Sequence, residues 1–299
     1  MNKIFIQTLK LLLLLPFFGS SLYAQSPVIA DGAELTLVSD RFSFTEGPAA
    51  DARGNIYFTD QPNNDIWIYT SEGELKLFMD EAGRSNGLYI AENGNILACA
   101  DDESELWSIT PDKEITVLVD GFEGKRLNGP NDLWQDPKGG IYFTDPYYQR
   151  EYWERTEKEI EEERVYYITP DREDLMIVAD GLVQPNGIIG TPDGKTLFVA
   201  DIGDGKTYSY SILDDGTLSN RTLFTDMGSD GVTLDEQGNL YLTGNGVAVF
   251  NKQGEQIEQI TIPKNWTANV TFGGADHQTL FITASEAVYT LQMKVRGAN

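Results

Sequence analysis

A short apolar run that alternates aromatic and aliphatic residues recurs along the chain, each time after a turn. The six segments read DARGNIYFTD, AENGNILACA, DPKGGIYFTD, TPDGKTLFVA, DEQGNLYLTG and GADHQTLFITA. Their turn positions are separated by 40, 45, 55, 44 and 39 residues and are Gly54, Gly94, Gly139, Gly194, Gly238 and His277. Repeats of about 40–50 residues with this β-rich pattern are typical of propeller blades with four strands each. We therefore predict an all-β, six-bladed β-propeller that occupies residues 25–299 as a single domain.

The register of this repeat singles out a second set of positions. The residue eight places before each turn always carries a side-chain carbonyl or carboxylate: Glu46, Asn86, Asn131, Asn186, Asp230 and Asn269. The first strand of a propeller blade lines the central axis, so these six residues, here called the axial ring, should lie at one height around it. Asn beside Gly is also common turn chemistry, and reuse of Asn as a local backbone cap is the alternative. Glu46 fits that alternative poorly, because its longer side chain caps a local backbone badly.

A ring of oxygen donors with two negative charges suits a hard divalent cation. Ca²⁺ accepts six to eight oxygens from carboxylates and amide carbonyls, and it is our first expectation. Mg²⁺, Mn²⁺ or Zn²⁺ are the alternatives, although the ring contains none of the Cys or His residues that thiolate or imidazole zinc sites use.

The longest repeat contains an insertion at about residues 147–164. The second strand of a blade returns to the face of the axial ring, so the residues after Asp145 should overhang that ring. Tyr147, Tyr148, Tyr152 and Trp153 are therefore candidates for a pocket wall or lid, and the following charged run has helical propensity. A solvated surface excursion is the alternative, especially for the charged part.

Serine-hydrolase chemistry is disfavoured. His277 is the single histidine, and its turn slot lies on the face opposite the axial ring. Ser229, beside Asp230, therefore has no histidine placed to activate it. Acid–base chemistry at the ring has to come from a carboxylate or from water on a metal.

The first 24 residues have the layout of a secretory signal peptide, with Lys3 and Lys10 before an apolar run and cleavage after Ala24. We expect an exported protein, periplasmic or secreted; a membrane anchor fits worse, since the uninterrupted apolar core is too short to span a bilayer. The net charge is −25, which disfavours nucleic acid and anionic membranes as partners. Cys99 is the only cysteine, which excludes an intrachain disulfide. The oligomeric state does not follow from the sequence.

Four motifs carry a family resemblance: FTEGPAADARGNIYFTD, LNGPNDLWQDPKGGIYFTDPYY, QPNGIIGTPDGKTLFVAD and GSDGVTLDEQGNLYLTG. They are similar in sequence and order to the gluconolactonase/regucalcin (senescence marker protein) family of six-bladed β-propeller lactonases. Diisopropyl fluorophosphatase and the paraoxonases are more distant relatives of the same architecture.

The resemblance implies roles for several residues. Glu46, Asn131, Asn186 and Asp230 would hold the divalent cation, Asp230 would act as general base or nucleophile, and Asn131 would join the metal or contact the substrate. Further substrate contacts are expected from Asn86, Asn128, Tyr147 and Tyr148.

The chain also departs from the regucalcin branch. Gly129 stands where that branch has an arginine, and Tyr147, Tyr148 and Gln149 replace its glutamates. Lys125 or Arg126 are candidates for the missing positive charge, with a solvated surface role as the alternative.

The predicted function is metal-dependent hydrolysis of a lactone, most simply a sugar lactone such as gluconolactone, which is a small molecule. One alternative is a phosphotriesterase of the diisopropyl-fluorophosphatase type, and another is a non-catalytic propeller that binds a sugar or a protein.

Overall fold

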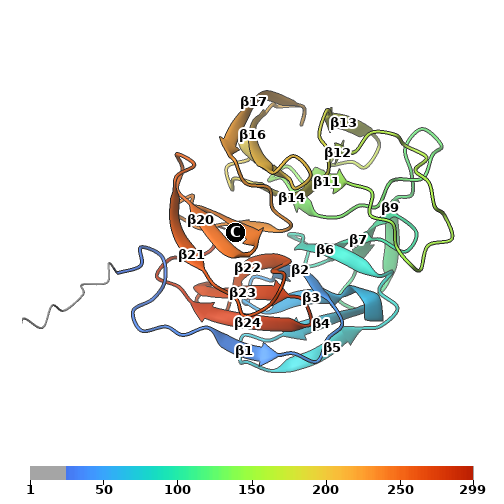
Figure 1. Cartoon of the computed structure of the whole chain (residues 1–299). Coiled ribbons are helices and arrows are strands. Elements are labelled where there is room, and N and C mark those ends of the chain that lie inside the picture. The colour runs from blue at the N-terminus through green and yellow to red at the C-terminus, as the bar shows by residue number, and fades with distance from the viewer. Residues whose placement is uncertain (1–24, 299) are drawn as a thin grey trace, which may run out of the picture.

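The computed structural model describes residues 25–298, and the predicted signal peptide lies outside these residues. Twenty-four strands form six four-stranded antiparallel sheets that are arranged as blades around a central axis (Figure 1). The six-bladed propeller prediction is confirmed.

The blades follow the chain in order. Blade 1 contains β2 (Thr45–Ala50), β3 (Ile56–Asp60), β4 (Asp65–Tyr69) and β5 (Leu75–Met79), with a short 3-10 helix at Gln61–Asn63. Blade 2 contains β6 (Ser85–Ile90), β7 (Ile96–Ala100), β8 (Glu105–Ile109) and β9 (Ile115–Val119). Blade 3 contains β10 (Leu133–Gln135), β11 (Ile141–Asp145), β12 (Arg164–Ile168) and β13 (Leu175–Ala179).

The second half of the chain repeats the arrangement. Blade 4 contains β14 (Pro185–Gly190), β15 (Thr196–Asp201), β16 (Lys206–Ile212) and β17 (Leu218–Thr225). Blade 5 contains β18 (Val232–Leu234), β19 (Leu240–Gly244), β20 (Gly246–Phe250) and β21 (Gln256–Ile260). Blade 6 contains β22 (Asn269–Gly273), β23 (Thr279–Ala284), β24 (Ala287–Gln292) and, as its outermost strand, β1 (Thr36–Ser39).

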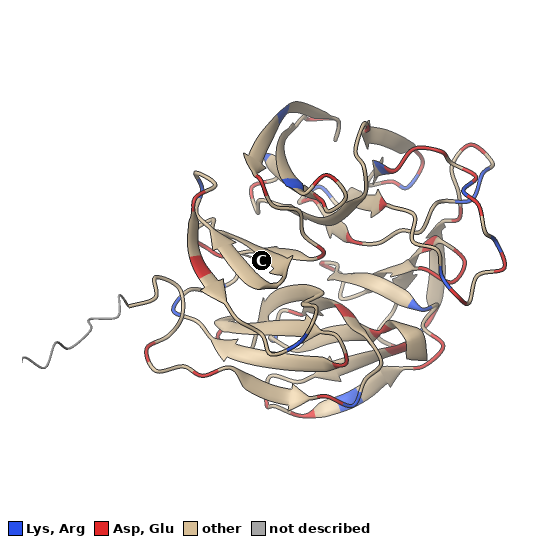
Figure 2. Ribbon diagram, viewed as in Figure 1, with Lys and Arg blue, Asp and Glu red and all other residues tan. Residues whose placement is uncertain are grey.

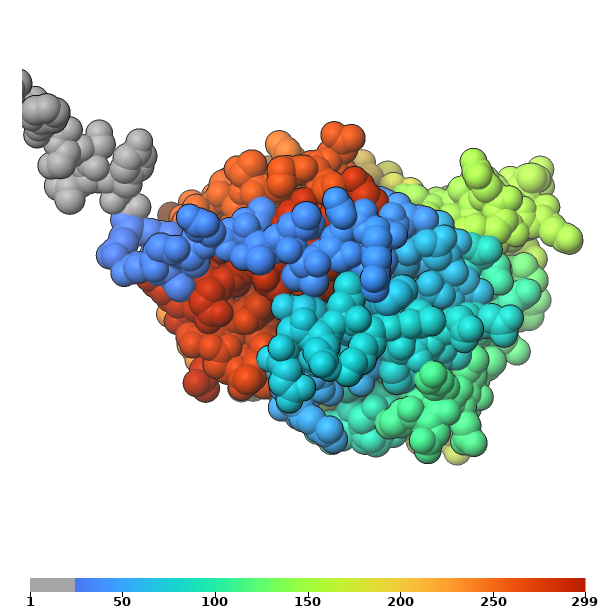
Figure 3. Space-filling model, turned by 90° about the horizontal axis from the view of Figure 1, so that it is seen from below, coloured from blue at the N-terminus to red at the C-terminus, as the bar shows by residue number. Residues whose placement is uncertain are grey.

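The ring of blades is closed by the N-terminal strand. β1 pairs antiparallel with β24, with Thr36 opposite Thr290 and Leu37 opposite Tyr289. Figure 3 shows the N-terminal segment in blue lying along the red C-terminal strands. This pairing ties the first and last parts of the domain together.

The turn of each repeat has one conformation. In all six blades the backbone N–H of the turn residue donates to the carbonyl three residues earlier. The turn residue has positive φ in every case, and His277, with φ 55°, adopts the conformation that glycine supplies elsewhere. His277 is therefore the structural equivalent of the five turn glycines, as the alignment of the repeats predicts.

Burial decreases from the axis outward. β7 and β11 are buried along their whole length, whereas the outer β9 is exposed at its first three residues. Hydrophobic side chains fill the space between neighbouring blades; one cluster joins Trp134 of blade 3, Leu197 of blade 4 and Leu240 of blade 5. Cys99 is buried in such a layer.

The insertion between β11 and β12 forms no helix, although its charged run favours one. Its side chains instead bond to blades 2 and 3, which holds the segment in an irregular path. Within residues 25–298 no helix is long and apolar enough to cross a bilayer. Acidic residues outnumber basic ones, 47 to 22, and they are distributed around the whole ribbon (Figure 2).

Candidate functional site

The six axial-ring residues lie at the start of the innermost strands. Glu46, Asn86, Asn186 and Asn269 belong to β2, β6, β14 and β22, and Asn131 and Asp230 come two residues before β10 and β18. Asp230 is partly buried, and the other five are buried. The structure thus places all six at equivalent points of the six blades.

Hydrogen bonds connect successive ring positions from blade to blade. The backbone N–H of Gly87, next to Asn86, donates to the carbonyl of Asn131 at 2.8 Å. The hydroxyl of Thr59 in blade 1 donates to the Asn86 carbonyl at 3.1 Å, and that of Thr144 in blade 3 donates to the Asn186 carbonyl at 2.7 Å. These bonds fix the height of each ring residue relative to its neighbour.

Glycine follows the ring residue in four blades because the neighbouring backbone comes close. A Cβ on Gly187 would lie 2.7 Å from the carbonyl oxygen of Asp230, and one on Gly231 would lie 2.1 Å from the amide oxygen of Asn269. In blade 3 this slot holds Asp132, whose buried carboxylate accepts from Leu133 N at 2.9 Å and from Asn269 Nδ2 at 3.5 Å. The repeat analysis missed Asp132.

Three acidic groups converge on the axis. Burial, followed by the neighbouring Asp230 carboxylate, raises the pKa of Glu46 well above its usual range. Burial raises the pKa of Asp230 to about 6, against the opposing effect of bonds from Trp266 and Asn186, and burial raises the pKa of Asp132 to about 7. Like charges held together out of water resist ionisation, and a cation between them would relieve that cost.

The donor set fits a hard divalent cation. Glu46 and Asp230 offer carboxylate oxygens, and the side chains of Asn86 and Asn131, 4% and 5% exposed, make no hydrogen bond to any residue from 25 to 298. Asn186 directs Nδ2 to Asp230 Oδ1 at 2.8 Å and to the Tyr148 hydroxyl at 3.0 Å, which leaves its Oδ1 for another partner. No group of three or more His, Cys, Asp or Glu suited to a metal occurs in the described part of the chain, so the amide oxygens would be necessary ligands.

Asp230 is oriented by two donors. Trp266 Nε1 donates to its Oδ2 at 2.6 Å, and Asn186 Nδ2 donates to its Oδ1. Trp266 comes three residues before Asn269 in the loop between blades 5 and 6, outside the repeat register. Sequence reasoning therefore missed it.

The insertion contributes side chains above the ring. Tyr148 reaches Asn186, and the guanidinium of Arg150 lies 5.3 Å from the centre of the Tyr148 ring. Arg150 is close enough to lower the pKa of both Glu46 and Asp230. Arg150 was also missed, and it supplies a positive charge near the ring, whereas Arg126 is half-buried and pairs with Glu103 at 3.3 Å.

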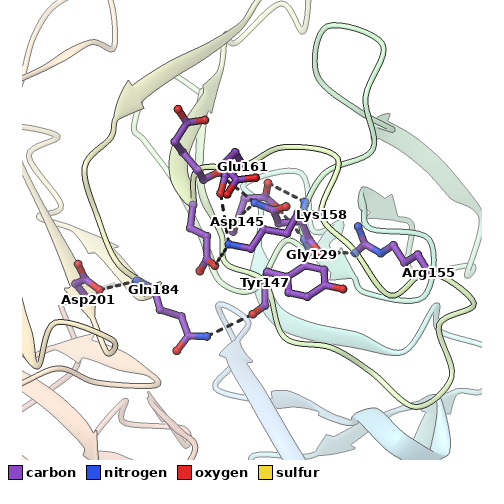
Figure 4. A network of polar contacts seen from close by, with 11 residues as sticks. Gly129, Asp145, Tyr147, Arg155, Lys158, Glu161, Gln184 and Asp201 are labelled. Carbon is purple, nitrogen blue, oxygen red and sulfur yellow. Dashed lines mark hydrogen bonds and ion pairs between the residues drawn. The ribbon is translucent and has the colours of Figure 1, made fainter.

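Tyr147 makes its hydrogen bonds with Gln149 of the insertion and with Gln184, and none with an axial-ring residue in the described part of the chain. Its hydroxyl donates to Gln149 Oε1 at 2.5 Å. Its carbonyl accepts from Gln184 Nε2 at 3.4 Å (Figure 4). Trp153 is buried, and its Nε1 donates to the Asp101 carbonyl at 2.8 Å. These contacts anchor the insertion to the propeller, and Tyr148 is the aromatic residue of the insertion that contacts the axial ring.

Asn128 is fully buried in the loop that precedes Asn131. Its Nδ2 donates to the Glu162 carbonyl at 3.2 Å, and its N–H donates to Asp145 at 2.9 Å. Asp145 also accepts from Gly129 N at 2.7 Å, so this carboxylate clamps the loop (Figure 4). These contacts favour a structural role for Asn128, and a substrate contact by this residue stays a prediction.

The Ser229 hydroxyl donates within its own blade, to the Gly231 carbonyl at 2.6 Å. His277 occupies its turn, and two shallow pockets beside the turns at Gly54 and Gly139 are lined by no axial-ring residue. The arrangement gives Ser229 no histidine partner and concentrates the acid–base groups at the axis.

Comparison with known proteins identifies similar chains. The family model for the SMP-30/gluconolactonase/LRE-like region matches residues 44–286. A gluconolactonase of Zymomonas mobilis subsp. mobilis is 29% identical over 294 residues, which cover 88% of this chain and 82% of that protein. The lactonase drp35 of Staphylococcus aureus strain MW2 is 30% identical over 282 residues, covering 83% and 81%. The solved structure of XC5397 from Xanthomonas campestris, described as a gluconolactonase, superposes with a TM-score of 0.82 at 29% identity, covering 89% and 90%.

Proposed function

The chain belongs to the SMP-30/gluconolactonase/LRE-like family, and from that premise we propose that it is a divalent-cation-dependent hydrolase that opens a lactone ring. A sugar lactone such as gluconolactone is the proposed substrate, and Ca²⁺ is the first cation to test. The observation that carries the proposal is the axial ring itself, where two carboxylates and several amides with unused oxygens converge at the start of the innermost strands.

Glu46, Asn131, Asn186 and Asp230 would hold the cation. When bound, the cation supplies Lewis-acid chemistry, polarising an ester carbonyl and stabilising the negative charge that develops on its oxygen. Asn131 has a buried amide with no partner among the described residues, so it is also suited to orient the substrate carbonyl.

Asp230 would act as the general base. Its carboxylate takes a proton from the attacking water, the water oxygen bonds to the lactone carbonyl carbon, and the ring C–O bond breaks as the ring oxygen gains a proton. The bonds from Trp266 and Asn186 hold the carboxylate in one orientation for this transfer. Direct attack by Asp230 on the carbonyl carbon is the alternative route.

We also propose that the protein is exported and works in the periplasm or outside the cell, because residues 1–24 have the layout of a cleaved signal peptide. Expression of the full chain in a bacterial host tests this proposal. Recovery of a mature protein that begins at Gln25 in the periplasmic or extracellular fraction supports it, and retention of residues 1–24 on cytoplasmic protein contradicts it.

A pH-stat assay over a panel of sugar and simple lactones, with diisopropyl fluorophosphate alongside, tests the proposed function. Acid release from lactones should be lost after chelation and restored by Ca²⁺. Preferential turnover of the fluorophosphate would support the phosphotriesterase alternative. Absence of turnover on every compound with cation present would favour a binding protein and contradict the proposal.

A further inference from the structure

Arg150 in the insertion stands beside the axial ring without belonging to it. Its Nε donates to Asp101 Oδ2 at 3.0 Å, and its side chain is 22% exposed while that of Asp101 is 2% exposed. The Tyr152 hydroxyl donates to the same carboxylate oxygen. Asp101, which directly follows β7 of blade 2, therefore fixes the Nε side of Arg150, and the guanidinium remains accessible.

Most donors of Arg150 are unused. A guanidinium carries five N–H groups, and within residues 25–298 only the one on Nε has a hydrogen-bond partner. The guanidinium lies over Tyr148, whose hydroxyl accepts from Asn186 and keeps its own proton free to donate. The two side chains thus present several donors next to the residues that would hold the cation.

The charges around Arg150 indicate what these donors would bind. Asp101 neutralises the guanidinium, and the nearby Glu46 and Asp230 are acidic. Even with the proposed cation offsetting Glu46 and Asp230, the site has no surplus positive charge to attract an anionic substrate, whereas an uncharged oxygen would accept the N–H bonds without needing one. The chemistry that fits is a neutral molecule bearing several hydroxyl groups.

We propose that Arg150, together with Tyr148, binds the hydroxyl groups of a neutral polyhydroxylated lactone, and that Asp101 is the positioning residue for Arg150. The inference rests on the proposed lactone hydrolysis, and it assigns the residues that would select one lactone substrate over another. The insertion would then determine which lactone is accepted, while the axial ring carries out ring opening.

The test compares two neutral substrates, glucono-1,5-lactone with four hydroxyl groups and δ-valerolactone with none. Arg150→Gln should lower kcat/KM for glucono-1,5-lactone by about tenfold to a hundredfold, the range for lost charge-assisted hydrogen bonds, and for δ-valerolactone by less than about threefold. Arg126→Gln is the matched control, because the side chain of this half-buried arginine pairs only with Glu103, and it should leave both rates unchanged.

The δ-valerolactone rate also reports whether the variant is folded, so selective loss on glucono-1,5-lactone cannot come from misfolding. If wild type opens both lactones and Arg150→Gln slows both equally or neither, the assignment of Arg150 is wrong and lactone hydrolysis stands. If wild type opens neither, the proposed function fails and the assignment falls with it.

Asp101→Asn tests the positioning role. It keeps an acceptor for Arg150 but removes the charge, so KM for glucono-1,5-lactone should rise severalfold while kcat and the δ-valerolactone parameters stay near wild type. A fall in kcat on both substrates, or no change on either, would contradict positioning through Arg150.

Discussion

Gly187→Ala tests how the blades set the geometry of the axial ring. The added Cβ would lie 2.7 Å from the carbonyl oxygen of Asp230 and 2.9 Å from a methyl carbon of Val232 in the next blade. Ordinary Cβ contacts begin at 3.4 Å, so the Asp230 carbonyl must retreat by about 0.7 Å. That shift moves Asp230 relative to Asn186 Nδ2, which donates to its carboxylate at 2.8 Å.

Overpacking of this kind costs about 1–3 kcal/mol, and the smaller freedom of alanine in the unfolded chain offsets about 0.4–1 kcal/mol. The free energy of unfolding, measured in urea, should fall by the difference between these two terms, which is at most about 2.6 kcal/mol. Because the shift separates two proposed ligands, Ca²⁺ affinity by calorimetry and lactone opening should fall with it.

Gly94→Ala is the matched control. Gly94 has φ 82° and open space around its Cβ position, so alanine there costs about 1–2 kcal/mol of left-handed strain without touching the axis. It should lower stability but leave Ca²⁺ affinity and activity unchanged. Wild-type stability and activity in Gly187→Ala, or an equal activity loss in Gly94→Ala, would refute the reasoning.

Three further perturbations test single contacts of the site. Thr144→Val removes the hydroxyl that donates to the Asn186 carbonyl at 2.7 Å and should lower the free energy of unfolding in urea by about 1–3 kcal/mol. An unchanged free energy of unfolding would show that this hydrogen bond does not stabilise the fold. Trp266→Phe removes a donor to Asp230 at 2.6 Å and should lower kcat by about tenfold, with little change in Tm because Trp266 is 37% exposed. An unchanged kcat would show that the orientation of Asp230 does not depend on Trp266. Chelation should lower Tm because Glu46 and Asp230 then repel each other out of water, and Ca²⁺ at a hundredfold excess over Kd should restore about 2.7 kcal/mol. A Tm that is unchanged by both treatments would contradict cation binding at the axial ring.

The fold could be predicted because the repeat carries two independent signals. The turn and its apolar run mark each blade, and the residue eight places earlier marks the axis. His277 illustrates the strength of the register, because it occupies a glycine slot and adopts the same positive φ.

The rest of the site could not be predicted because it lies outside the repeat. Arg150 reaches the axis from an irregular insertion, and Trp266 from an inter-blade loop, so no periodic pattern marks either residue. Asp132 did leave a readable signal, because it replaces the glycine that follows the ring residue in four other blades. The helical propensity of the insertion was overridden by contacts such as that of Trp153 with Asp101.

The most direct test of the central claim is the rate of lactone opening by Asp230→Asn at saturating Ca²⁺ in a pH-stat. Asparagine keeps an oxygen for the cation but cannot accept a proton, so the rate should fall by about 10²–10⁴-fold while circular dichroism and Tm stay near wild type. Asp226→Asn, at an exposed position four residues away, should retain the wild-type rate. A wild-type rate in Asp230→Asn would contradict the assignment of the axial carboxylate as the group that opens the lactone.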